Sequence, residues 1–189
     1  MTNTEIRREI LRMLYECFKE HPYNRMTSNE LKETLNIGQK ELQFNVIYLE
    51  EKGLLELQKP LEGSLFVGAR ITPKGIDLVE DEIQLDIVFP AQSTETSIST
   101  EIFDELQHLI HETSKSNEIN PDTKELIVEE IAEIQKQLKL SEPSYAEVKK
   151  LTERIKNHNS DIGRRLLAII RKPDIARALS NSAKKELGI

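Results

Sequence analysis

Hydrophobic positions near the start of the chain recur at the spacing of an α-helix. Apolar side chains recur every three or four residues between Glu5 and Glu20, which predicts a first helix with one apolar face. Thr27-Ser-Asn-Glu30 then has the spacing of a capping box, in which threonine and glutamate side chains each accept from the other residue's backbone N–H. A short second helix is therefore predicted, with Leu31 and Leu35 on one side.

A third helix is predicted from Gln39 to about Lys52, because Leu42, Val46 and Leu49 recur at intervals of four and three. The segment 36–38 between the two helices reads as a tight turn in which Gly38 tolerates positive φ. Gly53 stands where a left-handed residue closes a helix. A helix, a tight turn and a second helix form an arrangement that reads nucleic acid.

The period then changes from helical to alternating, which predicts a small hairpin. Leu55 and Leu57 form one strand, and alternate residues within 67–71 form the other. Thr72-Pro73 places a cap residue before a proline at the first helical position, so another helix is expected to start there. The predicted order is three helices, a hairpin and a helix.

Two short runs carry a resemblance to a known family. The run 48–56 reads Tyr-Leu-Glu-Glu-Lys-Gly-Leu-Leu-Glu, and the run 71–75 reads Ile-Thr-Pro-Lys-Gly. Residues 5–82 thereby resemble the winged helix-turn-helix transcriptional regulators, particularly the MarR-like and PadR-like proteins and their archaeal relatives. The resemblance implies that the first run ends a recognition helix and enters the wing, and that the second leaves the wing.

The face of the third helix opposite its apolar residues is the predicted contact surface. Lys40 suits a phosphate or guanine, Gln43 an adenine, and Phe44 or Ile47 a thymine methyl group. The same apolar side chains equally suit a protein partner or the second half of the chain. The residues predicted to contact DNA are Thr27, Ser28, Gln39, Lys40, Gln43, Phe44, Ile47, Lys59 and Arg70.

The second half of the chain is predicted to be helical, so that the whole is mainly α with a small β-wing. Domains are expected at 1–82 and 101–189, joined by a polar linker at 83–100, where residues 83–89 read either as a strand or as a continued helix. A helical hairpin is expected around the loop at 141–143, completed by the terminal helices or by a second subunit. We favour a homodimer formed through Ile127, Ile131, Ile134, Leu138, Val148, Leu151 and Ile155.

Charge makes a simple DNA-binding interpretation harder. Residues 1–82 hold 11 basic and 15 acidic side chains, a net charge of −4, whereas DNA-binding surfaces are usually basic. Residues 157–189 hold seven basic and three acidic side chains. This basic end either rims a packed helix with cations or, as a weaker alternative, binds an anionic membrane or nucleic acid.

Other functional classes find little support. His108 and His111 lie three residues apart near two glutamates, but without a third spaced ligand they predict no metal site. No phosphate-binding glycine loop or nucleophile elbow occurs, so neither an enzyme nor a cofactor is expected. The chain lacks an apolar run of membrane-spanning length and a signal-peptide start, which favours the cytoplasm. The expected function is DNA binding by a dimeric regulator; the alternative is a protein–protein adaptor.

Overall fold

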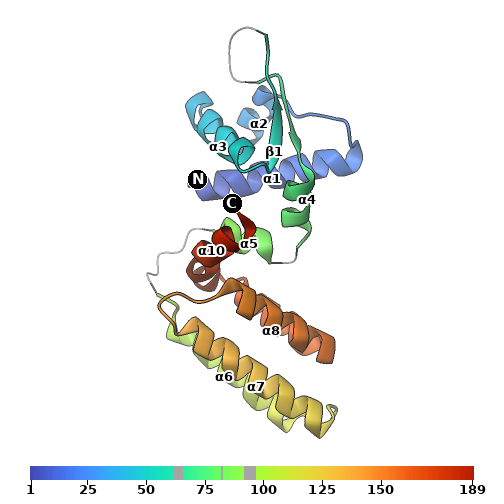
Figure 1. Cartoon of the computed structure of the whole chain (residues 1–189), viewed down its shortest axis with the longest axis vertical. Coiled ribbons are helices and arrows are strands. Elements are labelled where there is room, and N and C mark those ends of the chain that lie inside the picture. Colours follow the sequence, from blue (N-terminus) through green and yellow to red (C-terminus); the bar gives the residue numbers. More distant parts are fainter. Residues whose placement is uncertain (62–65, 82, 92–96) are drawn as a thin grey trace. The chain divides into compact units, whose positions relative to one another are not determined.

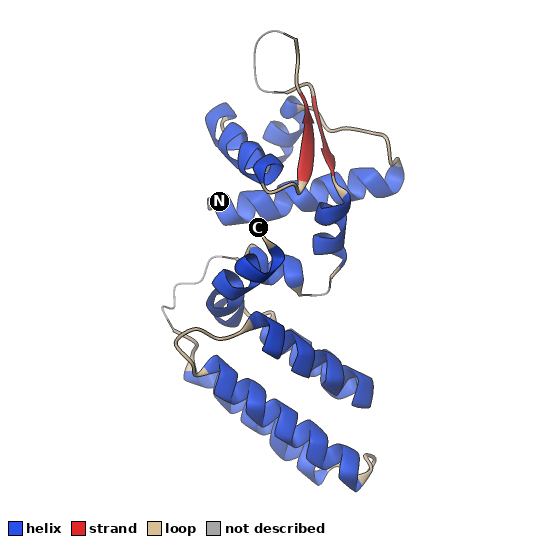
Figure 2. Ribbon diagram, in the orientation of Figure 1, coloured by secondary structure: helices blue, strands red, loops and turns tan. Residues whose placement is uncertain are grey.

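A computed structural model describes residues 1–61, 66–81, 83–91 and 97–189 as a mainly α-helical chain (Figures 1 and 2). The chain divides into two compact units, Met1–Leu85 (unit 1) and Asp86–Ile189 (unit 2), and each is described by itself. Within the described residues, no helix combines the length and the apolar character needed to cross a membrane.

Unit 1 contains three helices, a two-stranded antiparallel hairpin and a further helix, in the predicted order. This arrangement is compatible with a winged helix. The elements are α1 (Asn3–Glu20), α2 (Ser28–Leu35), α3 (Gln39–Glu51), β1 (Leu55–Gln58), β2 (Gly68–Ile71) and α4 (Pro73–Glu80).

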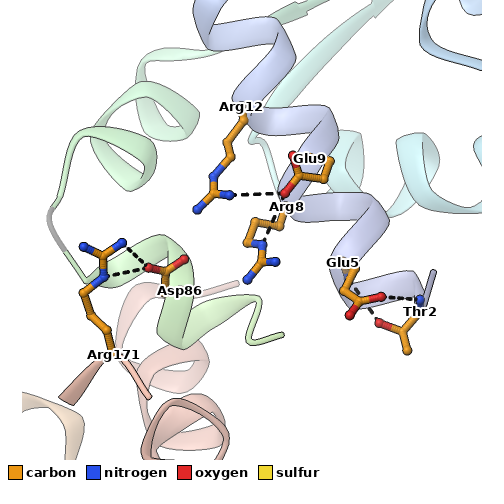
Figure 3. A network of polar contacts seen from close by, with 7 residues as sticks. All are labelled: Thr2, Glu5, Arg8, Glu9, Arg12, Asp86 and Arg171. Carbon is orange, nitrogen blue, oxygen red and sulfur yellow. Dashed lines mark hydrogen bonds and ion pairs between the residues drawn. The ribbon is translucent and has the colours of Figure 1, made fainter. Parts of the chain in front are cut away.

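Local capping determines where these helices begin. The predicted capping box of α2 is present: the Glu30 backbone N–H donates to the Thr27 hydroxyl, and the Thr27 N–H donates to the Glu30 carboxylate at 2.7 Å. Thr2 and Glu5 form a second capping box at the start of α1 (Figure 3). At α4, Thr72 accepts from the Gly75 N–H, and Pro73 occupies the first turn. These caps confirm the predicted starts of α2 and α4.

The turn between α2 and α3 differs from the prediction. The left-handed residue is Asn36, with φ of 51°, whereas Gly38 has φ of −74° and is the N-cap of α3. Asparagine tolerates the left-handed region better than most residues, so the left-handed residue of the turn lies two positions earlier than expected. Gly53, with φ of 69°, follows α3 as predicted.

The hairpin pairs Leu55 with Ile71 and Gln58 with Gly68, in antiparallel register. Part of the predicted loop between the strands, 62–65, lies outside the described residues. A bridge that the sequence did not reveal joins Met26 to Ala69, with both backbone hydrogen bonds between 2.8 and 3.0 Å. The extended segment before α2 therefore lies along β2 and ties the helix pair to the hairpin.

Unit 2 contains the remaining helices. The segment 83–89, expected to be a strand or a continuation of the preceding helix, holds a separate short helix, α5 (Gln84–Val88), that spans the unit boundary. Asp81 begins this turn, because its carboxylate accepts from the backbone N–H groups of Ile83 and Gln84. The other helices are α6 (Thr100–Lys115), α7 (Pro121–Leu138), α8 (Tyr145–His158), α9 (Ser160–Ile170) and α10 (Pro173–Leu187).

The helical hairpin α7–α8 is covered by other helices of the same chain. Helix α6 packs on α7, while α9 and α10 pack on α8. The side chains predicted to form a dimer interface are consequently buried, at 7% exposure or less: Ile127, Ile131, Ile134, Leu138, Val148, Leu151 and Ile155. They form the core of unit 2 rather than a face open to a second copy, which corrects their assignment to such a surface.

The segment predicted as a linker begins as part of the folded structure. Ile87, Val88 and Phe89 are fully buried, and the Ser180 hydroxyl on α10 donates to the Val88 carbonyl. The apolar alternation in this segment therefore marks buried positions. Residues 92–96 of the predicted linker lie outside the described residues.

Candidate nucleic-acid interface

The outer face of α3 is an open surface at which several of the predicted contact residues meet. Leu42, Val46 and Leu49 are fully buried, which fixes the opposite face of the helix outward. Phe44 and Ile47 remain 57% and 38% exposed. Gln39, Lys40 and Gln43 are also exposed, and these five predicted contact residues therefore share one face.

The start of α2 contributes less than predicted. Thr27 is exposed, but its hydroxyl donates to the Glu30 carboxylate and also accepts from the Glu30 backbone N–H. The Thr27 backbone N–H first, and then the Thr27 hydroxyl, donate to the Glu30 carboxylate and hold its pKa below the usual value. Ser28 is half-buried in the first turn of the same helix. Thr27 is therefore engaged in capping.

The cations of the hairpin are paired with carboxylates of unit 1. Lys59 lies 3.0 Å from Glu50, and Arg70 lies 2.8 Å from Glu56. Arg25, from the loop before α2, contacts the same Glu56 oxygen at 2.5 Å. Arg25 first, and then Arg70, hold the pKa of the Glu56 carboxyl below its usual value. The structure thus leaves Lys59 and Arg70 with less free charge than the sequence suggested.

Arg8 and Arg12 on α1 converge on one carboxylate. The Arg8 Nε atom lies 3.5 Å from Glu9, and the Arg12 guanidinium lies 3.2 Å from the same oxygen (Figure 3). Both pairs are partly exposed, so each contributes little to stability, and the single carboxylate offsets only one of the two positive charges.

A contact between α1 and α3 was missed by sequence reasoning. The Arg7 guanidinium lies 3.6 Å from the centre of the Tyr48 ring and 5.5 Å from that of Phe44. Its Nε–H donates to Asn45 Oδ1 at 3.0 Å. Asn45 is fully buried, and its amide donates to Asn3 Oδ1 and to the Glu41 carbonyl. An arginine therefore lies against one edge of the exposed α3 face.

The basic residues of the chain's end are engaged within unit 2. Arg171 lies 2.7 Å from Asp86 on α5 (Figure 3). Arg165 and Lys172 pair with Glu112 and Glu105, both on α6. These pairs agree with the expectation that cations rim packed helices.

The histidine pair predicted to hold no metal lies beside the same ion pairs. His108 is 3.4 Å from Glu112, which also binds Arg165. Among the residues that the structure describes, no three metal-ligating side chains gather into one group.

The geometry of unit 1 is therefore an exposed helix face with an arginine at its edge, beside a hairpin whose cations are paired. Comparisons with protein-family models, curated proteins and solved structures found no match for this chain.

Proposed function

We propose that the chain is a DNA-binding regulator in which unit 1 is a winged helix-turn-helix domain. The observation that carries this proposal is the outward face of α3. Lys40 and Gln43 are exposed there and have no hydrogen-bond or ion-pair partner within the described residues. The hydrophobic core holds the opposite face of the helix, so these side chains reach a groove without disturbing the fold.

In this mechanism α3 enters the major groove and the hairpin lies beside the backbone. Lys40 contacts a phosphate or guanine, and Gln43 reads an adenine. Phe44 and Ile47 contact thymine methyl groups, while Gln39, Thr27 and Ser28 lie toward the backbone. Lys59 and Arg70 contribute phosphate contacts only to the extent that their carboxylate partners release them. Occupation of a site regulates a gene without any chemical step.

The test measures binding of the full-length protein to mixed genomic fragments at two salt concentrations. Lys40→Ala and Gln43→Ala should each cost about 1–3 kcal/mol on a selected preferred site if the base contact is well formed. A control double variant, Lys115→Ala with Gln107→Ala, alters exposed residues of α6 and should bind like the wild type. Lack of binding by the wild type at low salt would refute the proposal.

A homodimer acting in the cytoplasm remains part of this proposal, because two copies match a symmetric operator. The buried core of α7–α8 does not supply its interface, so the contact surface must lie on other residues. Light scattering on the samples used for DNA binding tests this: a dimer mass supports it, and a monomer mass at all concentrations contradicts it.

The second candidate is a protein–protein adaptor, favoured by the exposure of Phe44 and Ile47 on an acidic unit. Large apolar side chains in adjacent turns are typical of a surface that a partner covers. Phe44→Ser with Ile47→Ser should then abolish partner capture while the circular dichroism and unfolding midpoint stay unchanged. Lys40→Ala with Gln43→Ala separates the two candidates, because it should weaken DNA binding and leave partner capture unchanged.

A further inference from the structure

The five arginines of unit 1 fall into two groups by their electrostatic environment. Four have a carboxylate within ion-pair distance. Arg8 and Arg12 share Glu9, while Arg25 and Arg70 share Glu56. Within the described part of the chain, no carboxylate pairs with the fifth, Arg7. The positive charge of this residue therefore remains uncompensated in an otherwise acidic unit.

Arg7 is also held in one orientation by contacts on two sides. Stacking on Tyr48 fixes the plane of the guanidinium, and the Nε–H bond to Asn45 fixes its rotation. Asn45 is itself fixed, because its amide group is buried and makes two further hydrogen bonds. The two terminal nitrogens of Arg7 make no hydrogen bond to the described residues, so a donor fork remains available.

The environment of this fork favours an anion. Arg7 is partly buried, and this burial lowers the pKa of its guanidinium, although an arginine stays protonated at neutral pH. Partial removal of water from around a cation costs free energy when no anionic partner takes its place. An anionic group that binds both terminal nitrogens offsets this cost, and little side-chain entropy is lost because the guanidinium is already oriented.

We infer that Arg7 is a phosphate-binding residue that anchors α1 to the DNA backbone beside the groove entered by α3. This inference rests on the proposed function. Arg7 is contributed by α1 and not by the outward face of α3, and it lies at the Phe44–Tyr48 edge of α3. When a helix occupies the groove, the surface that flanks it faces the sugar-phosphate strands.

The inference predicts different roles for two arginines of the same unit. Arg7→Gln removes the oriented, unpaired cation, whereas Arg70→Gln removes a cation that is bound to Glu56. The two variants have the same net charge. Binding of full-length wild type, both variants and Arg7→Lys to one labelled duplex is measured between low and physiological salt, and again on a duplex of unrelated sequence.

For Arg7→Gln we expect a loss of about tenfold in affinity on both duplexes, with the slope of log K against log salt reduced by about 0.9. Arg70→Gln should lose clearly less. Arg7→Lys keeps the charge but cannot reproduce the stacked fork, so it should recover the slope more fully than the affinity. Circular dichroism and the unfolding midpoint of each variant establish whether it is folded.

Three results would overturn the inference. Wild-type binding that Arg7→Gln leaves unchanged, or weakens no more than Arg70→Gln does, removes Arg7 as a contact and leaves the proposed function standing. A loss confined to one duplex makes Arg7 a base-reading residue. If the wild type binds no DNA at low salt, the proposed function fails, and the inference fails with it. If Arg7→Gln does not fold, the affinity of the folded Arg7→Lys variant decides: a loss on both duplexes with a nearly unchanged salt slope supports the inference, and wild-type affinity overturns it.

Discussion

Asn45 is the polar residue on which the contact between α1 and α3 depends. It is fully buried, and its amide group accepts from Arg7 and donates to Asn3 and to the Glu41 carbonyl. A buried amide is stabilising only when its partners are present, since an unsatisfied polar group in the core carries a desolvation cost. This residue and the Tyr48 ring together hold Arg7 in place.

Asn45→Ala should lower the free energy of unfolding of unit 1 by about 1–3 kcal/mol, because it removes the hydrogen bonds that a fully buried amide makes to the charged Arg7, to Asn3 and to the Glu41 carbonyl. Gln43→Ala, two residues earlier on the exposed face, should change it by no more than about 0.5 kcal/mol. Urea unfolding monitored by circular dichroism measures both. Equal midpoints for the two variants would show that the hydrogen bonds of Asn45 contribute no net stability.

At the scale of elements, interactions within one turn were predictable from sequence, whereas contacts between elements were not. The caps at Thr27 and Thr72 follow from residue type and spacing, because donor and acceptor lie three residues apart. The inward and outward faces of α3 follow equally from its period of 3.6. These local rules account for most of the fold of unit 1.

The candidate site was less predictable for the same physical reason. The orientation of Arg7 depends on residues 38 and 41 positions away, and the pairing of Arg70 with Glu56 depends on the hairpin register. Neither separation has a periodic signal in the sequence. The burial of the α7–α8 face was ambiguous too, because an apolar stripe looks alike whether the same chain or a second copy covers it.

Glu56 joins three elements, and this ion-pair cluster gives unit 1 a predictable pH dependence. Its carboxylate binds Arg25 from the loop before α2 and Arg70 from β2, so its pKa in the folded state is lowered. The resulting stabilisation is complete above the pKa of an unfolded glutamate, about 4.3, and is lost as pH falls through the lower folded value. The side chain is 43% exposed, so solvent screening keeps each pair on the order of 0–1 kcal/mol.

Glu56→Gln should therefore destabilise unit 1 at pH 7, and its difference from the wild type should shrink as the pH is lowered from about 5 to 3. Unfolding midpoints across this range provide the measurement. Glu16→Gln is the matched control, because it removes a carboxylate on the surface of α1 that pairs with Lys19 alone among the described residues. A difference between Glu56→Gln and wild type that is independent of pH would rule out the ion pairs as its cause.

Helix α10 caps the start of α8 from a distance. The Tyr145 N–H donates to the Ser182 hydroxyl, and the Ala146 N–H donates to the Glu186 carboxylate, which also accepts from Ser182. Ser144 supplies the local half of the cap by accepting from the Glu147 N–H. A carboxylate at this end of a helix is also favoured by the helix dipole.

Glu186→Ala should increase hydrogen exchange at the amides of Tyr145 and Ala146, because the first turn of α8 loses an acceptor and a favourable charge. Lys185→Ala changes an exposed neighbour on the same helix and should leave these amides protected. Exchange is followed residue by residue by nuclear magnetic resonance. Unaltered protection in Glu186→Ala would show that Ser144 and Ser182 are sufficient.

At the scale of the whole molecule, the net charge of −7 conceals a basic segment whose charges are used internally. Arg165, Arg171 and Lys172 each pair with a carboxylate contributed by an earlier helix of unit 2. Counted alone, residues 157–189 carry an excess of positive charge. In the folded unit, carboxylates from outside this segment compensate much of that charge.

In a flotation assay with anionic vesicles, the full-length chain should accordingly stay in solution and not rise with the vesicles. A peptide of residues 160–189 lacks the carboxylates of α5 and α6, and it should float with the vesicles and be released by salt. A peptide that also stays in solution would remove the basic segment as a source of membrane affinity. Flotation of the full chain would contradict the view that ion pairs within unit 2 neutralise it.

The hydrogen bond from Ser180 to the Val88 carbonyl joins residues 92 positions apart, so unit 2 begins and ends with helices that complete one another. This arrangement has a consequence for synthesis on the ribosome. All elements of unit 1 have been synthesised once Leu85 has emerged. The segment that includes α5, in contrast, is contacted by α10 only after the end of the chain has been synthesised. Nascent chains that stop before α10 would expose Ile87 and Phe89, and would therefore be substrates for chaperones.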